Sequence, residues 1–305
     1  MKSKKKFLSL LVFAPLLVGC GNNVKKPKFA EYHNEVKTYE KFVEEMLKVR
    51  NKSSLFKEEK IGSLEMKAKS GYLYTREVNR GKEVIDKNKE TSTSKGTGQY
   101  DAVNLIYKQD SISETEDVTE DSSGKDFNKD SYSRKFQFQT KDSKNGVTIN
   151  LDSKEYELTS YSGYKPAEYF DGFAKEMFAG SIGSYMSEVL SHYSAEDKDD
   201  FKFYKDGNIF TVVETFEEKQ EYEKSKYASK VSFTVQVDVT EGKWSTKYYT
   251  EYESTRTYKE NEYARAKGDV VVAKEYESAE ISVVSKKVSL KNLNLSKFKE
   301  APKSE

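Results

Sequence analysis

The sequence is poor in cysteine, in proline and in long apolar runs. It contains one cysteine and four prolines among 305 residues. A disulfide-linked scaffold needs paired cysteines, so the single thiol excludes that class. A protein with several membrane-spanning helices needs repeated runs of about 20 apolar residues, and the sequence has none.

The sequence also lacks an excess of charge of either sign. Its 52 basic and 51 acidic side chains give a formal net charge of +1. An ordinary nucleic-acid-binding protein shows a large basic excess, so we expect no nucleic-acid partner. Charged residues make up 34% of the chain, but aromatic residues are also frequent, with 22 Tyr and 17 Phe. Disordered chains are poor in aromatics, so we expect a folded domain.

The N-terminus carries the most specific motif. Four lysines precede the apolar stretch from Phe7 to Val18, in the order of a secretory signal peptide: Lys2, Lys4, Lys5 and Lys6. The tetrapeptide Leu17-Val18-Gly19-Cys20 resembles a bacterial lipobox. This resemblance implies diacylglyceryl transfer to the Cys20 thiol, cleavage before Cys20 and a lipid-anchored mature N-terminus. The alternative is an ordinary signal peptide with an incidental cysteine.

Processing at this site would change the charge and the boundaries of the protein. Removal of residues 1–19 takes away four lysines and leaves 48 basic against 51 acidic side chains, a balance of −3. Two acyl chains on one residue give stable anchoring, so we expect an extracytoplasmic protein held on the bacterial cell membrane. The predicted segments are a signal peptide (1–19), the lipidated cysteine and tether (20–28), a single domain (29–298) and a polar tail (299–305).

Two segments have the apolar periodicity of helices. In the segment 29–50, apolar residues recur at steps of three and four, which predicts an amphipathic helix: Tyr32, Val36, Tyr39, Val43 and Met46. Pro166 opens a second apolar segment, because a proline at the first helical turn loses no hydrogen bond. We expect Gly180 and Gly183 to divide this segment, which ends near Tyr193, into a helical pair.

The rest of the chain alternates between apolar and polar residues, as strands do. We predict antiparallel strands over 62–161, interrupted by a polar loop at 111–130, and a second run of strands after Ser194. Asn145-Gly146 stands between two alternating runs and predicts a hairpin. Strict alternation places one face of a sheet in water, which explains how a chain so rich in charge can fold.

The order of these elements resembles the LolA/LolB–LppX-like lipoprotein superfamily. The resemblance rests on Leu17–Cys20, the helix at 29–50, the hairpin at Asn145-Gly146 and the apolar helices at 166–193. It implies an α+β fold in which a curved antiparallel sheet forms an unclosed half-barrel. The N-terminal helix and the apolar helical pair would pack on its concave face, and acyl chains would bind between them.

The central apolar segment supplies the candidate binding residues. Bulky, adaptable side chains that face a curved sheet can line a pocket for an apolar ligand, and we predict this role for Phe170, Phe173, Met177, Phe178, Ile182, Tyr185 and Met186. The alternative is that they fill the core between helix and sheet. The Tyr-rich segment 248–263 is a second candidate, as a stacking surface for glycan or peptide.

Catalytic and metal-binding motifs are weak. The chain has two histidines, His33 and His192, and no Gly-x-Ser-x-Gly turn to expose a nucleophile. His192 and Glu196 are four residues apart, but one pair does not make a metal site. Residues 126–130 begin like a calcium loop, yet positions six and twelve lack the required glycine and glutamate. We therefore expect no enzyme, no metal and no cofactor.

These observations predict a membrane-anchored lipoprotein that binds or carries a hydrophobic or amphiphilic ligand. The alternative is a non-catalytic structural lipoprotein that contacts protein or glycan in the cell envelope. An extracytoplasmic hydrolase is a third hypothesis, with His192 as its candidate catalytic residue.

Overall fold

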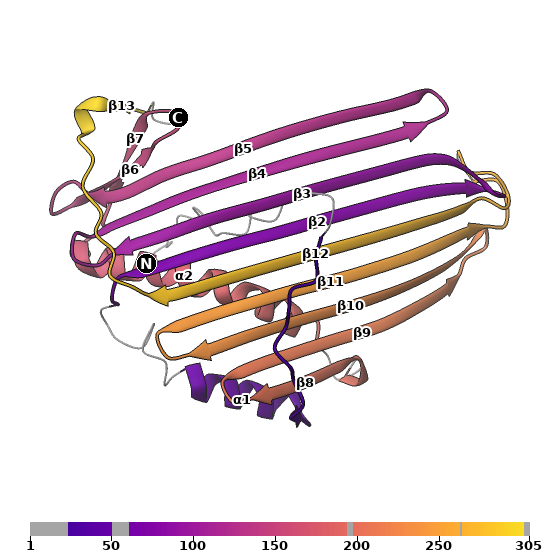
Figure 1. The fold of residues 1–305 in the computed structure, drawn as a ribbon, viewed down its shortest axis with the longest axis horizontal. Helices are drawn as coiled ribbons and strands as arrows, with labels where there is room; N and C mark the ends of the chain where they lie inside the picture. Colours follow the sequence, from indigo (N-terminus) through magenta and orange to yellow (C-terminus); the bar gives the residue numbers. More distant parts are fainter. Residues whose placement is uncertain (1–23, 51–60, 194–197, 263, 302–305) are drawn as a thin grey trace, which may run out of the picture.

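The computed structural model describes residues 24–50, 61–193, 198–262 and 264–301. Cys20, the rest of the lipobox and the predicted signal peptide lie outside the described residues, as does Glu196. One large sheet dominates the described part of the chain (Figure 1). None of the helices in these ranges is both long and apolar enough to cross a membrane.

The sheet contains thirteen strands among the described residues. They are β1 (Glu35–Val36), β2 (Leu64–Arg80), β3 (Glu83–Asp101), β4 (Ile106–Asp121), β5 (Gly124–Thr140), β6 (Asn145–Asn150), β7 (Glu155–Ser160), β8 (Phe201–Asp206), β9 (Ile209–Glu221), β10 (Ser225–Thr240), β11 (Lys243–Tyr258), β12 (Val270–Ser285) and β13 (Lys299–Glu300).

The strands form a curved, unclosed sheet in the order β1-β8-β9-β10-β11-β12-β2-β3-β4-β5-β6-β7-β13. All neighbours are antiparallel except β13 and β7. The two strand runs predicted from the sequence meet where β12 pairs with β2, for example at Val283 and Met66. The expected sheet-dominated fold is therefore present, with both runs in one sheet.

The alternating sequence explains the long strands of the second run. Val231, Val235 and Val237 on β10 are all buried, while the alternate residue Ser232 is half-buried on the other face. The predicted turns are also present. Gly207 and Gly242 join β8 to β9 and β10 to β11 with positive φ values of 63° and 71°, a conformation that glycine adopts without strain.

In the described part of the chain two α-helices accompany the sheet, and both differ from the prediction. The central apolar segment forms one continuous helix, α2 (Pro166–Ser191), so the expected helical pair is wrong. A glycine inside a helix costs only about 1 kcal/mol relative to alanine, which the packing of an apolar face can offset. The N-terminal helix α1 (Tyr39–Arg50) begins ten residues later than predicted, because residues 28–34 are bound to the sheet in an extended form.

The sheet has two distinct faces, which we call the helix face and the strap face. The helix face carries α2, which packs against β10, β11 and β12 (Figure 1). Two segments cross the strap face. They are the N-terminal strap (residues 24–34) and the C-terminal strap (residues 286–298), which includes a short 3₁₀ helix at Leu295–Lys297. Figure 1 shows the N-terminal strap in front of the strands and α2 behind them.

Side-chain amides of the sheet hold both straps. Gln236 on β10 accepts a hydrogen bond from the Ala30 amide at 2.7 Å and donates one to the Ala30 carbonyl at 3.0 Å. Gln137 and Gln139 on β5 donate to carbonyls of the C-terminal strap, each at 3.0 Å. These contacts explain how glutamines can be buried on a face that alternation alone would place in water.

The first strand run contains further differences from the sequence prediction. The expected polar loop at 111–130 is instead the outer part of a hairpin formed by β4 and β5, and the weak calcium-loop motif lies in β5. The hairpin near Asn145-Gly146 exists, but its turn is 141–144, where Asp142 accepts hydrogen bonds from the amides of Lys144 and Asn145. In the predicted polar tail, Lys299 and Glu300 pair with β7.

Candidate functional site on the helix face

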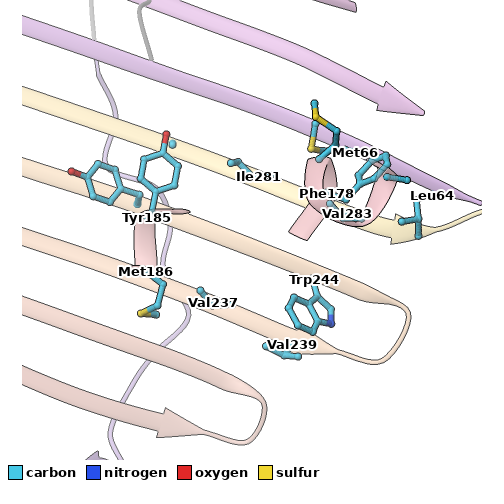
Figure 2. Packing of buried hydrophobic residues seen from close by; sticks show 14 of the residues in the cluster. Leu64, Met66, Phe178, Tyr185, Met186, Val237, Val239, Trp244, Ile281 and Val283 are labelled. Atoms are coloured by element: carbon cyan, nitrogen blue, oxygen red, sulfur yellow. The ribbon is translucent and has the colours of Figure 1, made fainter. Parts of the chain in front are cut away.

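The apolar residues predicted to line a pocket all lie on α2. Five of them are buried: Phe170, Met177, Phe178, Tyr185 and Met186. Phe173 is partly buried against the same cluster, and the side chain of Ile182 lies outside the described residues. Figure 2 shows Phe178, Tyr185 and Met186 among buried residues of the strands.

These side chains contact aromatic rings of the sheet. Phe170 stacks on Phe138 with ring centroids 4.5 Å apart, and Phe173 meets Tyr107 edge-on at 5.2 Å. Such contacts are those of core packing, which was the alternative considered from the sequence. The polar groups of the helix face therefore provide the better-defined candidate site.

A row of polar residues crosses the helix face at the middle of the sheet. Cross-strand register places Glu277 of β12 between Thr250 of β11 and Tyr72 of β2, and Tyr72 opposite Ser92 of β3. Residues directly opposite one another in antiparallel strands point to the same face. Glu277 also shares its face with Ile281 and Val283, because alternate residues of one strand do so.

Glu277 is a carboxyl group without a compensating partner. Its Oε1 atom is buried and has no hydrogen-bond partner among the described residues. Burial is the main cause that raises the pKa of Glu277 to about 7, and the neighbouring carboxylates of Glu188 and Glu275 contribute to the same shift. The charged neighbours that affect its ionisation are thus acidic, and a cation placed here would relieve both the burial and the repulsion.

Three tyrosines surround this carboxyl group. Tyr185 of α2 stacks on Tyr248 of β11 with ring centroids 4.5 Å apart and an interplanar angle of 24°. Burial is the main cause that raises the pKa of both hydroxyls, and the charge of Glu277 adds to it. Burial and the charge of Glu275 likewise raise the pKa of Tyr72. All three hydroxyls remain neutral at physiological pH and can donate hydrogen bonds.

A second polar atom on this face also lacks a partner. Ser94 of β3 is 4% exposed, and its Oγ has no hydrogen-bond partner among the described residues. It lies directly opposite Ser70 of β2, two positions along the strand from the row that contains Tyr72. A buried polar group left unpaired costs about 1–3 kcal/mol. Two such atoms on one face mark it as a place where a ligand or water would bind.

We call this group the carboxylate–tyrosine site and define it by Tyr72, Tyr185, Glu188, Tyr248, Glu275 and Glu277. Within the described ranges, no three His, Cys, Asp or Glu residues are arranged to hold a metal ion. An organic ammonium group suits this arrangement. It would pair with the charge of the carboxylates, which do not converge on one point, and would gain cation–π attraction from the tyrosine rings.

Sequence reasoning did not single out Glu277, because acidic residues are frequent throughout the chain. A signal was nevertheless present. In the alternating sequence of β12, Glu277 stands at one of the positions that point to the apolar face, as do Ile281 and Val283. A carboxylate is unexpected at such a position. Tyr248 of the Tyr-rich segment belongs to the site, whereas the role of that segment as a stacking surface for glycan or peptide stays a prediction.

Neither histidine is one of the residues that define the carboxylate–tyrosine site. The Nδ1 atom of His192 is 3.5 Å from Glu214 Oε2, and its ring meets Phe233 edge-on. His33 lies on the N-terminal strap, where its exposed ring is 3.5 Å from the Glu31 carboxylate. Neither of these contacts includes a serine or cysteine nucleophile, so they give no support to a hydrolase.

Comparison with known proteins yields no family. No family model matches the sequence, and no curated protein matches it. Among solved structures, the chain is similar to OccK7 (OpdD) of Pseudomonas aeruginosa, with 6% identity over 72% of this chain and 98% of that one and a TM-score of 0.20. A FadL homologue of the same organism has 6% identity, coverage of 73% and 90%, and a TM-score of 0.15. Likeness at this level carries no argument about function.

Proposed function

We propose that the protein is a non-enzymatic lipoprotein, anchored outside the cytoplasmic membrane through Cys20, that binds an amphiphilic ligand with a cationic head group. The lipobox supports the anchor. The unpartnered, buried carboxyl group of Glu277 among tyrosines supports the cationic head group. Phe233 of β10 is only partly buried and lies opposite Thr250 in the same row, so it would supply an apolar contact for an aliphatic portion of the ligand.

The arrangement of helix and sheet gives this proposal its geometry. We take the helix face to be the concave side of the curved sheet, as the resemblance to the LolA/LolB–LppX-like superfamily implies. Tyr185 extends from α2 toward β11, so the helix forms one wall of the carboxylate–tyrosine site. A ligand bound there would contact both layers of the fold.

The test is a binding measurement on the soluble chain from residue 21, whose folding is checked by circular dichroism. Calorimetric titration with butylammonium should detect binding, whereas butylsulfonate should not bind. Glu277→Gln should weaken the binding of the cation at least about tenfold at pH 8, because a hydrogen bond to a charged group contributes about 1.5–3 kcal/mol. Affinity for the cation should fall between pH 8 and pH 6, as Glu277 takes up a proton.

Glu251→Gln is the matched control, since Glu251 of β11 pairs in register with Tyr276 and therefore lies on the strap face. This variant should bind the cation as the unchanged chain does. Mass spectrometry of the natively purified protein should reveal a co-purifying cationic amphiphile. Equal binding of the ammonium and sulfonate probes, or equal loss in both variants, would contradict the proposed site.

A second candidate function is supported by an exposed strand edge. β6 pairs only with residues 136–140 of β5, so residues 124–134 of β5 have no strand on that side in the described part of the chain. A partner strand could pair with this edge, as in β-augmentation. A structural lipoprotein that contacts an envelope protein would use it, and cross-linking from residue 132 on intact cells would capture that protein.

A further inference from the structure

A pocket of about 370 Å³ lies on the strap face, on the opposite side of the sheet from the carboxylate–tyrosine site. The N-terminal strap forms one wall through residues 24–28. Strands β2, β3 and β12 form the floor through residues 69–71, Thr93 and residues 278–280. Gly71 is part of this floor, where an added Cβ atom would lie 3.7 Å from Val24. The strap and the sheet are thus in close contact at the pocket.

The lining of this pocket is strongly basic. It contains four lysines and one acidic residue: Lys25, Lys26, Lys28, Lys69 and Glu280. Lys69 pairs with Glu280 at 2.8 Å, and Lys26 lies over the Tyr249 ring at 5.2 Å. The ammonium groups of Lys25 and Lys28 have no ion pair or hydrogen bond among the described residues. The pocket therefore presents uncompensated positive charge to an anion.

Hydroxyl groups add neutral donors to the lysines. Thr93 and Ser278 are both on the floor of the pocket. Lysine ammonium groups with hydroxyl donors suit a phosphate group, which accepts several hydrogen bonds and carries negative charge. A carboxylate ligand would use fewer of these donors.

We propose that this pocket binds the phosphate group of an anionic membrane lipid. The inference rests on the anchor of the proposed function, because it uses the distance between Cys20 and Val24. Four residues span at most about 14 Å, so the pocket would lie within reach of the headgroups around the anchored cysteine. The strap face would then be turned toward the membrane, and the carboxylate–tyrosine site away from it.

The net charge of the whole protein is opposite in sign to the charge of this pocket. The chain from Cys20 onward has a formal balance of −3, so an anionic membrane surface would repel the molecule as a whole. Lysines close to an anionic surface each favour binding, while more distant charges are screened beyond about 8–10 Å. The pocket therefore sets an orientation that net charge alone would not.

The test uses the full-length, acylated protein reconstituted in nanodiscs of phosphatidylcholine, with or without phosphatidylglycerol. Hydrogen–deuterium exchange is followed at residues 24–28, 69–71 and 278–280. With phosphatidylglycerol, we expect exchange at the pocket to slow by roughly fivefold for each lysine that reaches a headgroup. The Lys25→Gln/Lys28→Gln variant should lose this protection, and 0.5 M NaCl should weaken it.

The matched control is Lys82→Gln/Lys219→Gln, which removes the same charge at exposed lysines outside the pocket and should leave the protection unchanged. Equal exchange in both kinds of disc would overturn the inference while the anchor stands. If inorganic phosphate protects the pocket in phosphatidylcholine discs, the pocket binds free phosphate, and the proposal of a lipid headgroup is wrong. Failure of the protein to associate with any disc would refute the anchor and this inference together, whereas cation binding at Glu277 would be unaffected.

Discussion

Glu277 is the residue whose ionisation distinguishes the helix face from the rest of the sheet. Most carboxyl groups of this protein either lie on the surface or have a basic partner, as Asp269 has in Arg80. That pairing, with an added hydrogen bond from the Ala266 amide, lowers the pKa of Asp269 to about 2. Burial without such a partner has the opposite effect on Glu277. Its ionisation should therefore affect stability as well as binding.

The Glu277→Gln variant should change how stability depends on pH. Because the folded-state pKa is raised to about 7 from 4.5, the native state holds a proton that the unfolded chain releases as pH rises from 4.5 to 7. The stabilisation is present below pH 4.5 and lost by pH 8. Removing the charge should thus stabilise the protein at pH 8, by up to roughly 2–3 kcal/mol, and little at pH 5.

Thermal unfolding of both chains at pH 5 and pH 8, without ligand, measures this effect. Differences in Tm between variant and unchanged protein cancel the contributions of other titrating groups. Glu251→Gln again serves as the control and should show no such pH-dependent gain. An equal Tm difference at the two pH values would show that Glu277 is not a buried, unpaired carboxyl group.

At the scale of the elements, strands that cover the core were predictable and strands beyond it were not. β10 alternates valine with polar residues, so the sequence indicated both its period and its buried face. The outer halves of β4 and β5 are polar on both faces, and contacts such as the 2.7 Å ion pair between Lys129 and Glu116 join them. Such a hairpin has no apolar period, which is why residues 111–130 resembled a loop.

The straps were not predictable because their partners are distant in the chain. The periodicity of Tyr32 and Val36 favoured a helix, but hydrogen bonds to Gln236 and Asp206 hold this segment extended. The continuity of α2 as one helix likewise depends on its packing against the sheet, not on the glycines in its sequence. The site required the same long-range information, since it unites α2 with β2, β11 and β12.

Gln236→Ala should release the N-terminal strap. The change removes both hydrogen bonds to Ala30 and should lower the free energy of unfolding by about 1–3 kcal/mol. We expect faster amide hydrogen exchange at residues 28–34. Gln220→Ala, at an exposed position of β9, is the control and should leave exchange in the strap unchanged. Unaltered exchange in both variants would contradict the role of Gln236.

At the scale of the whole molecule, the two faces present opposite chemistry. The helix face bears an unpaired acidic group among tyrosines, and the strap face bears unpaired lysines beside the first described residue. If Cys20 is acylated, these faces are turned toward different surroundings. The anchor at Cys20 stays a prediction from the sequence, while the separation of the two kinds of charge became visible only with the register of the strands.

Cys20→Ser tests the anchor directly in the full chain. Because acyl transfer requires the thiol, the variant should lose incorporation of an alkyne-labelled fatty acid and should leave the membrane fraction. Ser9→Ala, in the predicted signal peptide, should retain both properties. Labelling that persists in Cys20→Ser would show that the lipobox-like tetrapeptide is not the site of modification.

The pairing of β12 with β2 has a further consequence, for the order of folding. It joins the two halves of the sheet through contacts between distant parts of the chain, and Lys286 pairs with Glu65 across 221 positions of sequence. The entropy cost of closing such a long loop falls before the stabilising contacts between the two strands can form. Sheets of this kind therefore fold slowly. Until the C-terminal residues arrive, β2 has an open edge that can pair with another chain. Folding of this protein would therefore be sensitive to any factor that shields the open edge of β2 during synthesis.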